Sequence, residues 1–247
     1  MDRMIYTAMT GALHTMTQQA TVSHNLANAS TTGYRAQTDS FPAVPVYGDS
    51  LPTRALVLDT TTGSDFRPGP IQHTGRSLDV AVQSEGWLTV QLENGEEAYT
   101  RHGNLQIDAN GVLKTRDGQN VRGDGGVISI PPDSRIMVAK DGTVSVIPDD
   151  PKVTAVSIVG RLKLVNPPAE EMIRGDDGLF RLKDGGVALA DPKVILVEGA
   201  LESSNVNVIH EMVKMITLAR QFDMQMKMLE NAQHNSQQAS EILTLRN

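Results

Sequence analysis

The chain has 247 residues, a net charge of -7 and no cysteine. That length accommodates one or two domains, and the acidic balance argues against a nucleic-acid partner, because phosphate binding needs concentrated Lys and Arg. The lack of cysteine excludes disulfides, thiolate metal sites and thiol nucleophiles. No stretch approaches the roughly 18 apolar residues of a membrane span, and the start lacks the apolar core of a cleaved secretory signal.

Residues 1 to about 30 have the pattern of a long amphipathic helix. Apolar and small residues recur at alternating steps of four and three, the spacing that keeps one seam toward a partner helix. Gly33 is predicted to take a left-handed φ and to end this helix. We therefore expect an N-terminal helical assembly region over residues 1–36, with the candidate interface residues Ile5, Met9, Ala12, Met16 and Leu26.

The next segment, residues 37–75, is predicted to be an extended connector or docking strap. It contains Pro42, Pro45, Pro52, Pro68 and Pro70. Proline removes a backbone donor and clashes with the preceding turn, so a long helix is excluded here.

Residues 76–200 are predicted to form a mostly antiparallel β-domain. Short runs of alternating apolar residues are separated by Asx-Gly dipeptides at 94, 110, 117, 124, 141, 177 and 184. Asx-Gly favours tight hairpin turns because both residues tolerate φ > 0. Trp87, the only tryptophan, is interpreted as a core or interface anchor, with carbohydrate stacking as the alternative.

Residues 201–247 repeat the helical pattern at greater length. Ser204, Asn205 and Asn207 offer caps at the start. Two apolar stripes at opposite ends of one chain can cover each other or can pack on neighbouring copies, and the helix lengths favour assembly. The candidate interface residues are Ile209, Met212, Ile216, Ala219, Phe222, Met226 and Leu229.

These elements predict an α+β fold, in which N- and C-terminal helices form a coiled-coil-like assembly domain and the middle is antiparallel β-structure. The sequence has no phosphate loop, dinucleotide-binding glycine pattern, nucleophile elbow or paired zinc histidines. We therefore expect no catalytic, cofactor-binding or metal-binding residues and no enzymatic activity.

Two segments far apart in the chain resemble one known family. Residues 24–35 resemble the signature of bacterial flagellar rod and hook proteins, an Asn-Leu-Ala-Asn core followed by a Thr-x-Gly-aromatic-basic turn. Residues 199–207 with Glu211 and Met212 resemble the entry to that family's final helix, and motifs between them match its β-domain. The matched motif residues are Asn25, Leu26, Ala27, Asn28, Thr32, Gly33, Tyr34, Ser204, Asn205 and Val206.

The resemblance implies a structural subunit of the proximal rod that polymerises through its terminal helices and transmits torque. Its expected partners are copies of itself, other proximal and distal rod subunits and the surrounding ring proteins, with the type III export apparatus in transit. The expected location is the periplasmic rod of the basal body, reached without signal cleavage. A distal rod subunit, a periplasmic carbohydrate-binding β-domain and a hydrolase with an unfamiliar site stay open as alternatives.

Overall fold

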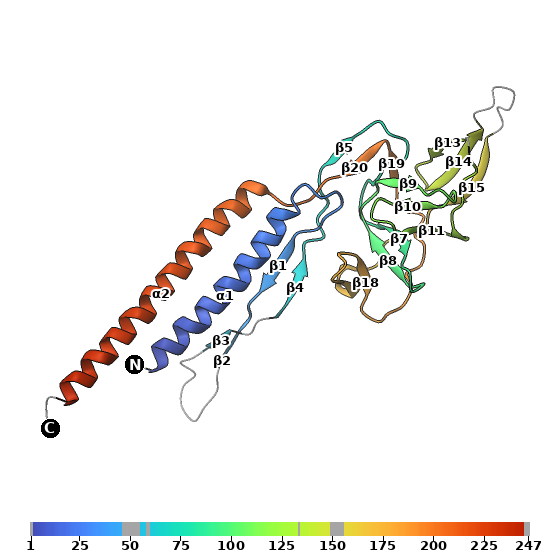
Figure 1. Ribbon diagram of the computed structural model, residues 1–247. Helices are drawn as coiled ribbons and strands as arrows, with labels where there is room; N and C mark the ends of the chain where they lie inside the picture. Colours follow the sequence, from blue (N-terminus) through green and yellow to red (C-terminus); the bar gives the residue numbers. More distant parts are fainter. Residues whose placement is uncertain (1, 46–54, 58–59, 133, 149–155, 245–247) are drawn as a thin grey trace. The chain divides into compact units, whose positions relative to one another are not determined.

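A computed structural model of the chain describes residues 2–45, 55–57, 60–132, 134–148 and 156–244 (Figure 1). Pro52 of the predicted connector and residues 149–155 of the predicted β-domain lie outside the described residues. The chain divides into two units. Unit 1 comprises residues 1–29, 36–65 and 206–247, and unit 2 comprises residues 30–35 and 66–205. The backbone therefore passes between the units four times.

Unit 1 contains both long helices, α1 (Asp2–Ala27) and α2 (Val208–Thr244). α1 ends at Ala27 because the Asn28 side-chain amide donates to the His24 carbonyl at 2.9 Å, which occupies an acceptor of the last turn. α2 begins after Asn207, whose Oδ1 accepts the His210 N–H at 3.1 Å as a helix cap. Asn207 is thus the cap among the three predicted.

The left-handed conformation predicted for Gly33 is confirmed by its φ of 70°. The predicted role of Gly33 as the helix terminator is wrong, because α1 ends before Asn28 and Gly33 lies in a later turn. The polar side chain of Asn28 stops the helix before a glycine is needed.

The strands that the structure describes in unit 1 form a β-arm within the predicted connector. β1 (Gln37–Ser40) pairs with β4 (Thr60–Ser64), and β2 (Ala43–Pro45) pairs with β3 (Ala55–Val57), both antiparallel. β1 also packs against α1. The extended conformation expected for this segment is therefore organised as hydrogen-bonded strand pairs.

Unit 2 is built from short antiparallel strands, as the sequence predicts. Its nine-stranded sheet has the order β17-β18-β8-β7-β11-β10-β9, with β12 beside β11 and β16 beside β7. The members are β7 (Trp87–Gln91), β8 (Glu97–Thr100), β9 (Leu105–Ile107), β10 (Leu113–Thr115), β11 (Asn120–Gly123), β12 (Gly126–Val127), β16 (Leu164–Val165), β17 (Met172–Arg174) and β18 (Phe180–Leu182).

Three smaller pairings complete unit 2. β13 (Ser134–Val138), β14 (Thr143–Pro148) and β15 (Ser157–Arg161) form a three-stranded sheet, and a short 3-10 helix covers Ala169–Glu171. β6 (Val80–Val82) pairs with β19 (Leu196–Glu198), and β5 (Ile71–His73) pairs with β20 (Ala200–Glu202). Two strands from the beginning of unit 2, β5 and β6, are therefore hydrogen-bonded to two strands from its end, β20 and β19.

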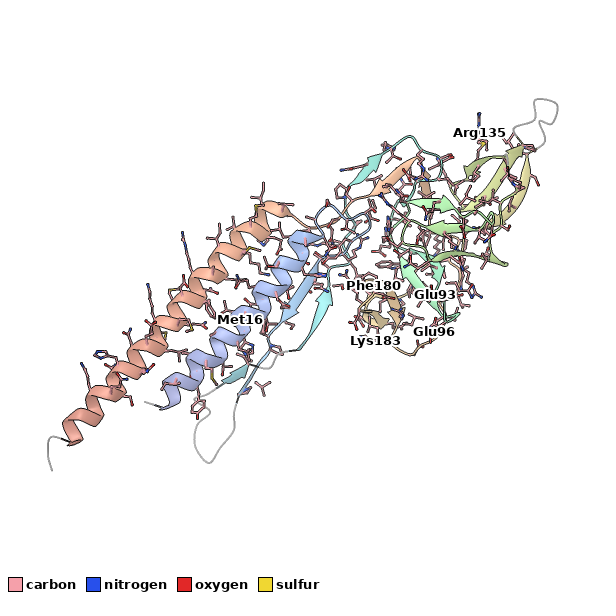
Figure 2. The ribbon with its side chains drawn as sticks, viewed as in Figure 1. Met16, Glu93, Glu96, Arg135, Phe180 and Lys183 are labelled. Atoms are coloured by element: carbon pink, nitrogen blue, oxygen red, sulfur yellow. The ribbon has the colours of Figure 1, made fainter. Side chains whose placement is uncertain are left out.

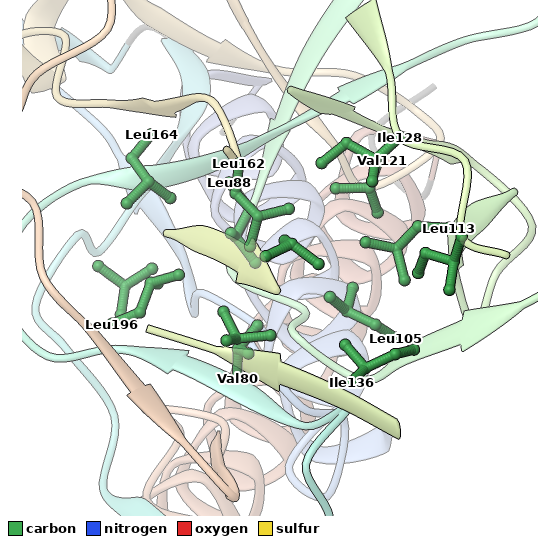
Figure 3. Close-up of a cluster of buried hydrophobic side chains, with 14 of the residues drawn as sticks. Val80, Leu88, Leu105, Leu113, Val121, Ile128, Ile136, Leu162, Leu164 and Leu196 are labelled. Atoms are coloured by element: carbon green, nitrogen blue, oxygen red, sulfur yellow. The ribbon is translucent and has the colours of Figure 1, made fainter. Parts of the chain in front are cut away.

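The main core of unit 2 gathers branched aliphatic side chains from most of these strands (Figure 3). Trp87 belongs to a second cluster and is only 4% exposed, with its ring centroid 4.6 Å from that of Phe180. The interpretation of Trp87 as a core anchor is confirmed. Its burial also removes the stacking surface that the carbohydrate-binding alternative needed.

Leu105→Ala should lower the free energy of unfolding of unit 2 by about 2–5 kcal/mol, because a fully buried leucine leaves a cavity when truncated. Leu189→Ala is the matched control, since Leu189 is 88% exposed and should cost almost nothing. Urea unfolding followed by Trp87 fluorescence measures both. Equal losses would place Leu105 outside the core.

Candidate assembly site

The two terminal helices lie side by side and antiparallel in unit 1 (Figure 1). The α2 side chains that are buried or half-buried toward α1 recur in steps of three and four: Met215, Leu218, Phe222, Gln225, Leu229 and Ala232. On α1, Thr15 is buried, and its hydroxyl lies 3.4 Å from the Gln225 amide nitrogen. The helices therefore pack against each other as an antiparallel pair within the chain.

The structure divides the predicted interface residues between two faces. Ala12 is buried, and Ile5, Leu26, Phe222 and Leu229 are half-buried. The remaining predicted residues are exposed: Met9, Met16, Ile209, Met212, Ile216, Ala219 and Met226. The sequence predicted one apolar seam on each helix. In the structure, each helix has one face that packs against the other helix and a second apolar face that nothing in the described chain covers.

Asn25, the first residue of the N-terminal motif, joins α1 to the β-arm. Its amide nitrogen donates to the Gln37 carbonyl at 2.9 Å, and its Oδ1 accepts the Gln37 N–H at 2.8 Å. One turn earlier, the Thr21 hydroxyl donates to Asp39 at 2.6 Å. A side chain that pairs with both polar groups of one backbone residue substitutes for a strand neighbour, which fixes β1 along the helix.

The two family motifs meet at a buried carboxylate in unit 2. Glu202 is 1% exposed and accepts Arg35 Nη1 at 2.6 Å and Arg101 Nη1 at 2.8 Å. It also accepts the Gly69 N–H at 2.8 Å. We call Arg35, Gly69, Arg101 and Glu202 the Glu202 junction. The junction connects four segments of the chain: Arg35 follows α1, Gly69 follows the β-arm, Arg101 belongs to the β-domain and Glu202 precedes α2.

Two guanidinium groups face one carboxylate, so the junction holds an excess of positive charge. Burial lowers the pKa of Arg101, Glu202 opposes this, and neighbouring Arg35 lowers it further. The Trp87 ring compensates part of the excess, with the Arg101 and Arg35 guanidinium carbons 5.3 and 5.7 Å from its centroid.

Two glycines let the backbone approach this junction closely. Gly33 donates its N–H to the Glu202 carbonyl at 2.7 Å. A Cβ at Gly33 would lie 2.4 Å from the Arg101 carbonyl carbon, and a Cβ at Gly69 would lie 2.1 Å from the Ser203 carbonyl oxygen. A larger residue at either position would push the motif segments apart.

The remaining motif residues surround this arrangement or lie on α1. Tyr34 is buried, and its ring lies 4.5 Å from the Arg174 guanidinium carbon, while Arg174 donates to the Arg35 carbonyl at 3.1 Å. Ser204 is buried, and Asn205 donates to the Arg67 carbonyl at 3.0 Å. Leu26, Asn28, Thr32 and Val206 are half-buried, and Ala27 is exposed.

Within the described ranges, no group of three or more His, Asp or Glu side chains is arranged to hold a metal ion. The helices of the described chain also include none that is long and apolar enough to cross a bilayer.

Sequence reasoning missed the Glu202 junction. Arg35 and Glu202 are separated by 167 positions and Arg101 and Glu202 by 101, so no local spacing links them. One signal was available. Glu202 follows Ala200 and Leu201 in a short apolar segment, where a charged residue needs a buried partner.

Comparison with known proteins shows that both terminal regions and part of the β-domain match models of related protein families. Residues 5–35 match the family described as flagella basal body rod protein. Residues 81–146 match the flagellar hook protein FlgE/F/G D1 domain, and residues 197–242 match the flagellar basal body rod FlgEFG protein C-terminal family. The chain belongs to the family of flagellar basal-body rod proteins, which are structural and not enzymes.

Within this family, the chain is similar over its full length to FlgF-type proteins. It is 48% identical to the flagellar basal-body rod protein FlgF of Escherichia coli (strain K12) over 99% of this chain and 100% of that protein. FlgF of Salmonella typhimurium gives the same identity and coverage. FlgG of Buchnera aphidicola subsp. Acyrthosiphon pisum is 30% identical over 90% of this chain and 92% of that protein.

Proposed function

We propose that this chain is a subunit of the flagellar proximal rod that polymerises through its terminal helices and transmits torque in bacterial motility. The observation that carries the proposal is the paired α1 and α2 with an apolar face left exposed on each helix. Exposed contiguous apolar surface favours a protein contact. Full-length identity of 48% to FlgF against 30% to FlgG supports the proximal rather than the distal rod.

The proposed partners are copies of this chain, other rod subunits and the surrounding ring proteins. The proposed location is the periplasmic part of the basal body, reached through the flagellar type III export apparatus without signal cleavage. Export of that kind suits a helical region whose seam contains Ala, Thr and Gln, since weak seams unfold at low cost.

Deleting the gene tests the role in the rod. Cells without this chain should lose motility, and their purified basal bodies should lack the completed rod in electron micrographs. Re-expression should restore both, and the chain should be found in the restored basal bodies. Normal swimming of the deletion strain, or absence of the chain from basal bodies, would contradict the proposal.

Phe222→Asp tests the helical pair itself. Phe222 is half-buried toward α1, so a carboxylate there should separate the helices and block incorporation into the rod. Gln221→Asp, one position away and exposed, adds the same charge and should incorporate normally. Trp87 fluorescence should show unit 2 unfolding unchanged in both variants. Normal incorporation of Phe222→Asp would show that the pair is not needed.

A further inference from the structure

α1 carries an exposed apolar stripe on a surface without charge. Tyr6, Met9, Leu13 and Met16 follow steps of three and four and are 63, 53, 63 and 55% exposed; Figure 2 labels Met16. Residues 4–34 contain no Asp, Glu, Lys or Arg. A surface helix facing water normally has a charged or polar outer face, so this face has the composition of a contact surface.

α2 carries a second exposed stripe near its beginning. Ile209, Met212, Val213 and Ile216 are 76, 48, 59 and 56% exposed. At 100° per residue, they lie on the side of α2 opposite Leu218 and Gln225, which face α1. Farther along α2 the outer face changes character, because the exposed residues Arg220, Asp223, Lys227 and Glu230 lie there.

The α1 stripe and the α2 stripe lie at different positions along the axis of the helical pair, so they cannot cover each other within one chain. Gln225 contacts α1 at Thr15, and a Cβ on Gly11 would lie 2.9 Å from the side-chain amide nitrogen of Gln225. The α1 stripe is therefore level with the neighbourhood of Gln225. The α2 stripe is centred about 13 residues earlier, which is a displacement of about 20 Å along the helix.

We propose that the α1 stripe of one copy packs against the α2 stripe of a neighbouring copy, displaced by about 20 Å along the helices. This pairing rests on the proposed function as a rod subunit and names the contact that joins subunits. Two different surfaces on one chain make a head-to-tail contact, and the displacement along the helices lets this contact repeat as an open helix instead of closing into a flat ring, as a rod requires. An α1 stripe packed on another α1 stripe would instead close a dimer.

The distribution of charge on α2 indicates that the first part of this helix is the surface that contacts the α1 stripe. The outer face around Asp223 and Lys227 would lose water against the α1 stripe without gaining any opposite charge, because α1 has no Asp, Glu, Lys or Arg from residue 4 to its end. The charged residues between Ile209 and Ile216, Glu211 and Lys214, are half-buried and lie on the side of α2 away from the exposed stripe, so α1 can cover the stripe at no such cost.

Paired cysteines test this contact cleanly, since the chain has no native cysteine. Leu13→Cys is combined in turn with Ile209→Cys, Met212→Cys and Ile216→Cys. A disulfide forms only when the two Cα atoms lie within about 7 Å, so three positions along α2 are tried to include the one that lies opposite Leu13 of the neighbouring copy. Mild oxidation of basal bodies carrying these variants should give covalent dimers or larger products in at least one pairing. Leu13→Cys with Lys227→Cys is the matched control and should give none.

The outcomes separate this contact from the proposed function. Variants present in basal bodies but not cross-linked in any of the three pairings would overturn the contact and leave the rod assignment intact. Dimers from Leu13→Cys alone would also overturn it, because they would show a two-fold contact between α1 stripes. The same variants are oxidised as concentrated purified protein. The contact is thus measured even if the chain is absent from basal bodies, an outcome that would instead contradict the proposed function.

Discussion

Glu202→Gln should lower the free energy of unfolding of unit 2 by about 3–5 kcal/mol, because it leaves two buried guanidinium groups without a carboxylate. The side chain keeps its shape, so the loss reports charge and not packing. Arg35 and Arg101 lie 2.6 and 2.8 Å from the Glu202 oxygens and cannot reach water without moving. A loss of this size is a large share of the stability of an ordinary domain.

Urea unfolding followed by Trp87 fluorescence measures this effect, and Glu198→Gln is the control. Glu198 is exposed and lies one strand earlier, so its neutralisation should change stability by less than about 0.5 kcal/mol. Adding Arg101→Met to Glu202→Gln removes one uncompensated charge and should restore part of the loss. A Glu202→Gln variant as stable as the control would show that the junction is hydrated.

Gly33→Ala should destabilise unit 2 much more than Gly95→Ala, although both glycines have positive φ, 70° and 86°. A Cβ at Gly95 meets nothing within 4 Å, so that variant carries only the conformational cost of about 1–2 kcal/mol. A Cβ at Gly33 would lie 2.5 Å from the His102 nitrogen as well as against Arg101.

The extra contact should raise the loss for Gly33→Ala to about 3 kcal/mol or more, since main-chain atoms cannot rotate away as a side chain can. Thermal unfolding of the two variants and the parent gives the comparison. Equal midpoints for the two variants would mean that the chain around Gly33 has room for a side chain and that its φ alone matters.

Features with a local cause could be predicted from the sequence. The conformation of Gly33, the cap at Asn207 and the antiparallel pairing between Asx-Gly turns each depend on a few neighbouring residues. The burial of Trp87 follows from a single large ring in an apolar strand. For Gly33, Asn207 and the turns, the decisive interaction lies within a few positions of the residue, whereas the partner ring of Trp87, Phe180, comes from a distant strand.

Features that depend on distant residues could not be predicted in the same way. Met9 and Ala12 both fit a helical seam by spacing, yet Met9 is 53% exposed and Ala12 is 8% exposed. Periodicity gives the relative positions of side chains on a helix, whereas the face that is buried depends on what the chain places beside it. For the same reason no local signal indicates that the β-arm packs against α1, and the apolar segment around Glu202 indicates a buried partner without identifying it as Arg35.

The division of unit 1 into three segments has a consequence for the order of folding. Thr15 and Gln225 are 210 positions apart, so closing that loop in an unfolded chain would carry a large entropic cost. Unit 2 contains mostly local hairpins, and its backbone bond from Asn205 to Tyr34, 3.4 Å long, joins the segments that follow α1 and precede α2. Once unit 2 has formed, the helices are effectively joined by a short connection. We therefore expect the β-domain to act as an intramolecular template that raises the effective concentration of α1 for α2, so that the helices pair last.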